Sequence, residues 1–167
     1  GRAHLYCIAD TKTSTSTSKP TSLKPELTAS VELSDLDNDG DLDVLVANGR
    51  HWGGPNRAYY NNGKGAFPRV VTIGTGKDRS YAARALDYNG DGLMDVAIAN
   101  DRQQSRIYLG QKNRKFTLGP AIGPATQNTR NLTITDLDGD KRPDILIANR
   151  RAANFIYGHT PKGDLVK

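Results

Sequence analysis

An acidic segment that occurs three times constrains what this chain can fold into more than any other feature of the sequence. The acidic boxes span residues 35–43, 87–95 and 136–144, and each runs into an apolar segment, at 44–48, 96–100 or 145–149. The match extends beyond the boxes, because a tyrosine recurs at Tyr59, Tyr108 and Tyr157 and an Ile-Gly pair at 73–74 and 122–123. Each period of about 50 residues is therefore expected to form one unit of similar structure.

Each period predicts four short strands. Apolar residues alternate with polar ones before the boxes, at Val31 and Leu33 and again at Leu132 and Ile134, with a weaker signal at 83–85. The apolar run after each box fits a strand buried on both sides. The tyrosine segment is the third strand, and turn residues at 62–65 lead to a fourth around 70–73. Four-stranded units at this spacing predict an all-β fold of β-propeller blades, although β-sandwiches also have short, evenly spaced strands.

The repeats divide the chain into three expected blades, at residues 28–78, 79–127 and 128–167, with each acidic loop between the first and second strands. The third is expected to lack its fourth strand, because the sequence given stops two residues after Leu165. An apolar stretch within residues 1–10 predicts a strand that completes another blade. Residues 11–27 are rich in Thr, Ser, Lys and Pro and predict a flexible linker.

The spacing inside the boxes predicts metal binding. Oxygen-bearing side chains stand at positions 1, 3, 5 and 9 of every box, and the position-7 carbonyl is a further expected ligand. A cage of hard oxygens suits Ca²⁺, which accepts ~6–8 such ligands, so up to three ions are expected. The expected side-chain ligands are Asp35, Asp37, Asp39, Asp43, Asp87, Asn89, Asp91, Asp95, Asp136, Asp138, Asp140 and Asp144, and the carbonyls are those of Asp41, Leu93 and Arg142.

The third box is expected to bind most weakly. Gly40 and Gly92 at position 6 allow the positive φ that a tight curl needs, whereas the third box has Lys141 there, followed by Arg142. An EF-hand is excluded, because its loop needs a glutamate at position 12 and flanking helices. Position 12 is Val46, Ile98 or Ile147 in the three boxes, within an expected strand.

The strand–DxDxDGxxD–strand pattern at this period resembles the FG-GAP/VCBS repeats of integrin α-subunit-like β-propellers, over residues 28–167. The resemblance implies a Ca²⁺ ion with a mainly structural role in each acidic loop. It also implies partners that bind on the loop faces of a closed ring. The same repeats form non-catalytic parts of many secreted enzymes, so the resemblance implies the fold and the metal more closely than the task.

Three repeats cannot close a propeller of the usual ~4–8 blades. One interpretation is a fragment of a longer propeller, with the N-terminal strand ending the preceding blade. Another is an assembly, either a closed oligomer or a filament in which each subunit donates its N-terminal strand to a neighbour. A self-contained solenoid or sandwich is the third.

The charge balance points to a basic surface. The chain has 23 basic and 18 acidic residues, and twelve of the acidic residues lie in the three boxes. Acidic glycans or acidic subunits are therefore possible partners, whereas no motif indicates nucleic acid. Arginines follow the buried strands, and they either form a cationic arc or pair locally: Arg50, Arg102, Arg150 and Arg151. Trp52, in a three-residue insertion, either stacks on a partner or folds over its own blade.

Catalysis has little support from the sequence. The three histidines follow no repeated pattern, and the close carboxylates are explained as metal ligands. No apolar run approaches the ~18 residues of a membrane span. The sequence therefore predicts a non-enzymatic, extracellular or cell-surface module, stabilised by Ca²⁺, with a structural, adhesive or self-assembling role. The alternatives are a non-catalytic propeller portion of a secreted carbohydrate-active enzyme and a polyanion- or glycan-binding module.

Overall fold

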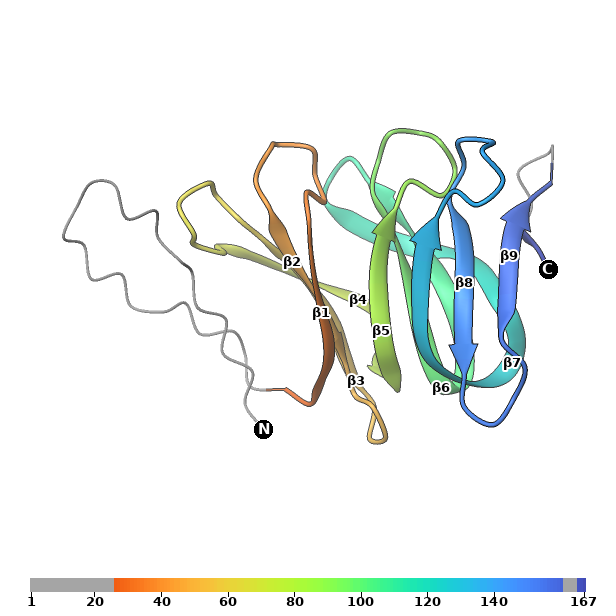
Figure 1. Cartoon of the computed structure of the whole chain (residues 1–167). Coiled ribbons are helices and arrows are strands. Elements are labelled where there is room, and N and C mark those ends of the chain that lie inside the picture. Colours follow the sequence, from red (N-terminus) through yellow and green to blue (C-terminus); the bar gives the residue numbers. More distant parts are fainter. Residues whose placement is uncertain (1–25, 161–164) are drawn as a thin grey trace, which may run out of the picture.

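The computed structural model describes residues 26–160 and 165–167, and every regular element in them is a β-strand (Figure 1). The first sheet has the order β1-β2-β3-β4 and the second has the order β10-β9-β8-β7-β6-β5, with antiparallel pairing throughout. The strands are β1 (Thr28–Ser34), β2 (Asp43–Asn48), β3 (Gly54–Tyr60), β4 (Arg69–Asp78), β5 (Ser80–Leu86), β6 (Asp95–Gln111), β7 (Lys115–Thr135), β8 (Asp144–Asn149), β9 (Phe155–His159) and β10 (Leu165–Val166). The all-β prediction is confirmed, while the expected N-terminal strand and most of the expected linker lie outside the described residues.

The strands that flank each box form where the sequence predicts them. In the first repeat, β1 pairs with β2 through Val31 opposite Val46 and Leu33 opposite Val44. Every residue of β2 is buried, as its continuous apolar run predicts, whereas β1 is only partly buried. The same pairing recurs between β5 and the start of β6, and between the end of β7 and β8.

Two strands are longer than the sequence predicts. β6 contains the expected second and third strands of the second repeat, and it reverses direction near Arg102, which has a φ of 54°. The reversal brings the Gly110 amide to 2.7 Å from the Asp95 carboxylate. β7 likewise joins the last strand of the second repeat to the first strand of the third, because it pairs with β6 and then with β8. β6 and β7 thus each contain two of the expected strands. In each case the chain bends and then pairs again without an intervening loop.

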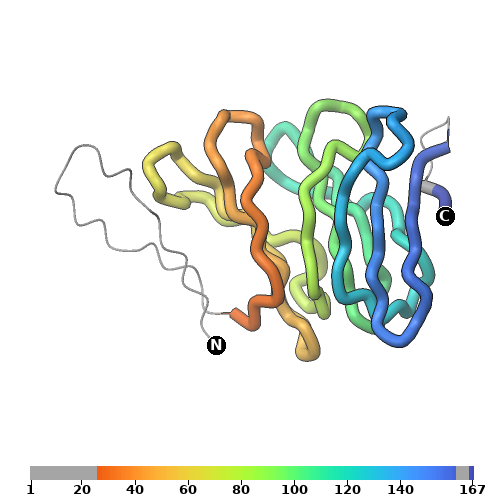
Figure 2. Tube along the Cα trace, in the orientation of Figure 1, coloured from red at the N-terminus to blue at the C-terminus, as the bar shows by residue number. Residues whose placement is uncertain are grey.

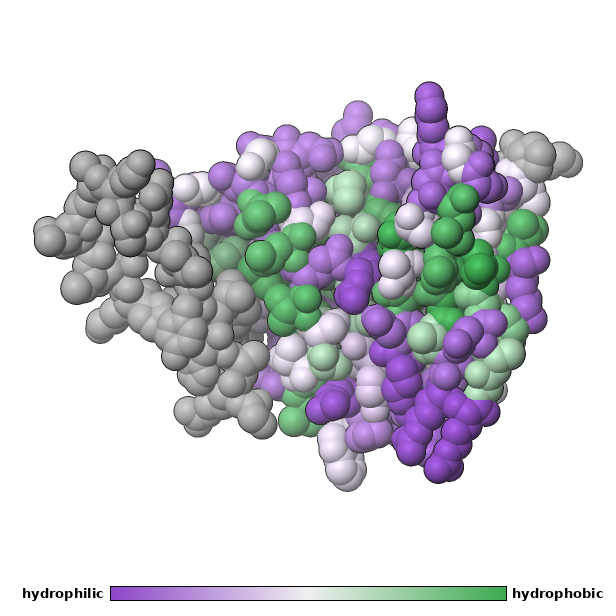
Figure 3. Space-filling view, viewed as in Figure 1, coloured by the Kyte–Doolittle hydropathy of each residue, from purple (hydrophilic) through white to green (hydrophobic). Residues whose placement is uncertain are grey.

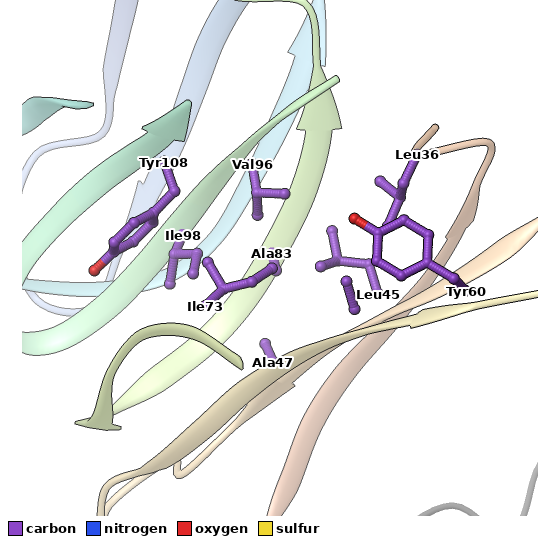
Figure 4. Packing of buried hydrophobic residues seen from close by; sticks show 10 residues of the cluster. Leu36, Leu45, Ala47, Tyr60, Ile73, Ala83, Val96, Ile98 and Tyr108 are labelled. Atoms are coloured by element: carbon purple, nitrogen blue, oxygen red, sulfur yellow. The ribbon is translucent and has the colours of Figure 1, made fainter. Parts of the chain in front are cut away.

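The first core cluster lies between the first sheet and the adjoining part of the second sheet (Figure 4). Alternate residues of β2, Leu45 and Ala47, face the residues Val96 and Ile98 of β6. Because side chains alternate between the two faces of a strand, Val44 and Val46 of β2 lie in a different cluster with Tyr59.

The second core cluster forms because the six-stranded sheet folds over itself. Ala97 and Ala99 of β6, on the face opposite the first cluster, pack with Ile145 and Ile147 of β8. The chain is thus three packed layers, one for each sequence repeat. At the third layer's outer edge, the two residues of β10 pair with β9 in the place of a fourth strand.

The recurring tyrosines and Ile-Gly pairs meet across the layers. A Cβ atom added at Gly74 of β4 would lie 2.9 Å from the Tyr108 hydroxyl, and one added at Gly123 of β7 would lie 2.6 Å from the Tyr157 hydroxyl. Tyr108 and Tyr157 therefore each cover the glycine of the preceding repeat. The glycine is required for two reasons, the close approach and a positive φ of 85° at Gly74 and 69° at Gly123.

We expect Gly74→Ala to destabilise the chain more than Gly76→Ala. Both glycines have a positive φ, but no described atom lies within 4 Å of a Cβ at Gly76, whereas a Cβ at Gly74 would clash with Asp78 and Tyr108. Urea unfolding should show an extra loss of about 1–3 kcal/mol for Gly74→Ala, the usual cost of overpacking. Equal losses for the two variants would contradict the proposed role of the tyrosine–glycine contact.

Candidate metal loops

The three acidic boxes form the β1–β2, β5–β6 and β7–β8 loops, and all three lie at the same end of the molecule (Figures 1 and 2). The β2–β3 and β8–β9 turns lie at the opposite end. The common placement follows from the repeat, since each box joins equivalent strands that run in equivalent directions.

One hydrogen-bond scheme shapes every loop. The position-6 amide donates to the position-1 carboxylate, at 2.9 Å in box 1 and 3.0 Å in boxes 2 and 3. The position-7 amide donates to the position-5 carboxylate, at distances of 3.0, 2.8 and 2.8 Å. Local bonds of this kind from an aspartate to the following backbone curl the chain into a turn. The curl keeps the short side chains of positions 1, 3 and 5 within one tight loop.

The aspartate at position 9 is the buried anchor of each loop. Its carboxylate accepts the position-2 amide, at 2.9 Å for Asp43, 3.0 Å for Asp95 and 2.7 Å for Asp144. The first two also accept an amide at the end of the third strand, from Asn61 at 2.8 Å and Gly110 at 2.7 Å. Burial raises the pKa of the Asp43 and Asp95 carboxyls, and these backbone donors lower it in part.

Two positions in each loop have a positive φ, whereas the glycines of the boxes predict only one, at position 6. Position 6 has φ values of 90° at Gly40, 80° at Gly92 and 68° at Lys141. Lys141 therefore adopts the curl without a glycine, and the third box keeps the loop geometry at the cost of strain. Position 4 is also positive in all three loops. Its signal in the sequence is the series Asn38, Gly90 and Gly139, residues that favour this conformation.

The carboxylates converge in two of the three boxes. One oxygen from each of Asp35, Asp37 and Asp39 lies within 4.8 Å of the others, and the same holds for Asp136, Asp138 and Asp144. Among the described residues, the second box has no such group of three, in part because its position 3 is Asn89. There the amide nitrogen of Asn89 lies 3.0 Å from an oxygen of Asp91.

The first box fits a hard cation. The side chain of Asp37 is only 6% exposed, and its Oδ2 atom lies 2.6 Å from the Nε atom of Arg114. Burial raises the pKa of this carboxyl, while the Arg114 guanidinium lowers it in part. Buried oxygens of this kind are costly unless a cation or a donor satisfies them. The three converging carboxylates therefore suit Ca²⁺, although the Arg114 guanidinium already offsets part of the charge of Asp37.

The predicted partner-binding residues lie away from the acidic loops. Arg50, Arg102 and Arg151 have φ values of 45°, 54° and 56°, so they occupy turn positions after the buried strands. All four predicted arginines are exposed, and none forms an ion pair with a carboxylate of the described segments. Trp52 is 80% exposed. The interpretation that it folds over its own unit is therefore wrong, because the insertion carries it out of the β2–β3 turn.

Comparison with known proteins agrees with this geometry. The family model of the FG-GAP-like repeat matches residues 35–98 and 87–147, which contain all three boxes. No curated protein matches the chain. FG-GAP repeats are typically non-catalytic modules and are typical of extracellular proteins. The described segments contain no helix that could cross a membrane. The chain belongs to the FG-GAP-like repeat family.

Proposed function

We propose that the chain is a calcium-stabilised segment of a β-propeller, with one blade for each sequence repeat. The observation that carries the proposal is the single hydrogen-bond scheme that recurs in all three loops, together with the convergence of three carboxylates in boxes 1 and 3. A solvated acidic turn has no need to repeat this scheme three times beside a buried aspartate. The function of the loops is then to hold a metal that fixes each blade.

Bound Ca²⁺ would neutralise carboxylates that otherwise repel one another. Two carboxylates at about 4 Å repel by roughly 1–4 kcal/mol, depending on how well water screens them. Positions 1, 3, 5 and 9 of each box would supply side-chain oxygens to the ion, and position 7 would supply its carbonyl. Because the unfolded chain has no preformed cage, metal binding and folding are coupled.

The proposed setting is extracellular, and the proposed task is structural or adhesive. Extracellular modules bind Ca²⁺ with dissociation constants of ~10⁻⁴–10⁻³ M. We expect affinities in this range for loops as exposed as these. Two observations support a module that is not an enzyme. Repeats of this family are typically non-catalytic, and the carboxylates that lie close together are the proposed metal ligands.

The outer face of the third repeat supports a self-assembling role. Leu45 and Ala58 of the first repeat are fully buried, and so are their equivalents Ala97 and Ile107 in the second. The equivalent of Ala58 and Ile107 in the third repeat, Ile156, is 54% exposed. This face is apolar around β8 (Figure 3) and includes a hollow lined by Leu146, Ala148 and Ile156. A second copy of the chain would continue the packing that joins the layers within one copy.

Removing Ca²⁺ should lower the thermal stability of the chain. One site at a hundredfold excess of metal over its dissociation constant contributes about 2.7 kcal/mol. With two or more sites filled, EDTA should lower Tm by about 10 °C or more for a domain of this size. The check is a melt followed by circular dichroism in Ca²⁺, in EDTA, and in EDTA with Ca²⁺ restored. A melt that is the same in all three conditions would refute the structural role of the metal.

Asp91→Ala should destabilise the Ca²⁺-loaded chain more than Asp140→Ala. The two aspartates are matched, since both are exposed, both stand at position 5, and both accept the position-7 amide at 2.8 Å. The third box has the strained Lys141 and the adjacent Arg142, so it should bind the ion less tightly. Tm measured in Ca²⁺ should separate the variants, and in EDTA the difference should shrink. A larger loss for Asp140→Ala in Ca²⁺ would reverse the ranking.

Ile156→Glu should reduce self-association. A charge on the outer face of the third repeat opposes the burial of that face against a second copy. Leu118→Glu is the matched control, because Leu118 is 64% exposed and lies at the start of β7, on the second repeat. Light scattering in Ca²⁺ should show a larger mass for the unchanged chain and the control than for Ile156→Glu. Equal masses for all three chains would argue against this face as the interface.

A further inference from the structure

The β6–β7 turn of the second repeat places a cation against the first acidic loop. The Nε atom of Arg114 lies 2.6 Å from Oδ2 of Asp37, and its Nη2 lies 3.7 Å from Oδ2 of Asp39. Arg114 is 39% exposed, whereas the Asp37 side chain is 6% exposed. The guanidinium therefore pairs with two of the three carboxylates that converge in box 1.

The fold holds Arg114 in this place from several directions. Its backbone has a φ of 59°, and its amide donates to the Gln111 carbonyl at 2.8 Å, so the turn is tight. Its guanidinium lies 5.5 Å from the ring centroid of Tyr60, a buried residue of β3. Arg69 of β4 donates to the carbonyl of the preceding residue, Asn113, at 2.6 Å. The first repeat therefore fixes the turn that carries Arg114.

In the part of the chain that the structure describes, no carboxylate of box 2 or box 3 has such an ion pair. The positions equivalent to Arg114 in the first and third repeats are Gly65 and Gly163, as counted from the recurring tyrosines. In the described residues, the ion pairs of box carboxylates all involve Arg114. Box 1 is also the most acidic of the three, with five aspartates.

We propose that Arg114 is a tethered counter-ion that competes with Ca²⁺ for the carboxylates of box 1. The proposal rests on the metal binding proposed above. A guanidinium and a metal ion draw on the same negative charge, so each gains less from Asp37 and Asp39 when the other is present. Such a coupling is reciprocal, because the ion weakens the arginine contact by the same factor as the arginine weakens the ion. Arg114 thus stabilises the first loop without metal and lowers its affinity for Ca²⁺.

Arg114→Gln should tighten Ca²⁺ binding at one site while it weakens the metal-free protein. We expect a roughly tenfold gain in affinity at that site by calorimetric titration, within the usual range of couplings between two ligands. In EDTA the same variant should melt at a lower temperature than the unchanged chain, because the box 1 carboxylates lose their counter-ion. Lys112→Gln removes the same charge from the same turn, and it should change neither quantity.

Arg114→Lys provides a second variant that keeps the charge but loses the planar donor. Arg114→Lys should raise the Ca²⁺ affinity at that site and lower the melting temperature in EDTA, each by less than Arg114→Gln does. If Arg114→Gln does not fold, Arg114→Lys tests whether Arg114 competes with Ca²⁺. Unchanged or weaker Ca²⁺ binding in the folded variant would overturn the proposal for Arg114, and would leave the metal loops in place. Failure of the unchanged chain to bind Ca²⁺ would instead overturn the proposed function itself.

Discussion

The rest of this structure depends on a buried carboxylate at the ninth position of each acidic box. Asp43 and Asp95 are completely buried, and each accepts one amide from the start of its loop and another from the end of the third strand. A buried carboxylate without such donors would be very costly, so the backbone must approach it from both sides. These bonds fix how the loop closes, and in boxes 1 and 3 three carboxylates then lie close together.

Packing between the layers relies on small residues and on one recurrent contact. The alanines of β2, β3, β5 and β6 let neighbouring layers approach, and the tyrosine of each later repeat covers the glycine of the repeat before it. The acidic loops at one end are coupled to this packing, because the position-9 aspartate joins each of the first two loops to the third strand of its own layer. Asn38 of the first loop also donates to the Gly92 carbonyl of the second at 2.8 Å. An ion held in one loop would therefore bear on the contact between layers.

Features that repeat in the sequence could be predicted, and features that occur once could not. The repeat predicted the strands on either side of each box. A short, continuous apolar run such as 44–48 is typical of a strand that is buried on both faces. The assignment of metal ligands in the loops stays a prediction, and it overlooked the bonds that the Asp43 and Asp95 carboxylates accept from the backbone. Arg114 carried no signal, because its contact with Asp37 depends on how two layers pack and its equivalents are glycines. The exposure of Trp52 likewise depends on an insertion that no other repeat shares.

The central claim is that the three loops are metal sites. The most direct test is to count the ions bound to the folded chain by equilibrium dialysis against a series of Ca²⁺ concentrations. If the three loops are metal sites, we expect three ions per chain at saturation, with the site of the third box the last to fill. Less than one ion per folded chain at millimolar Ca²⁺ would contradict it.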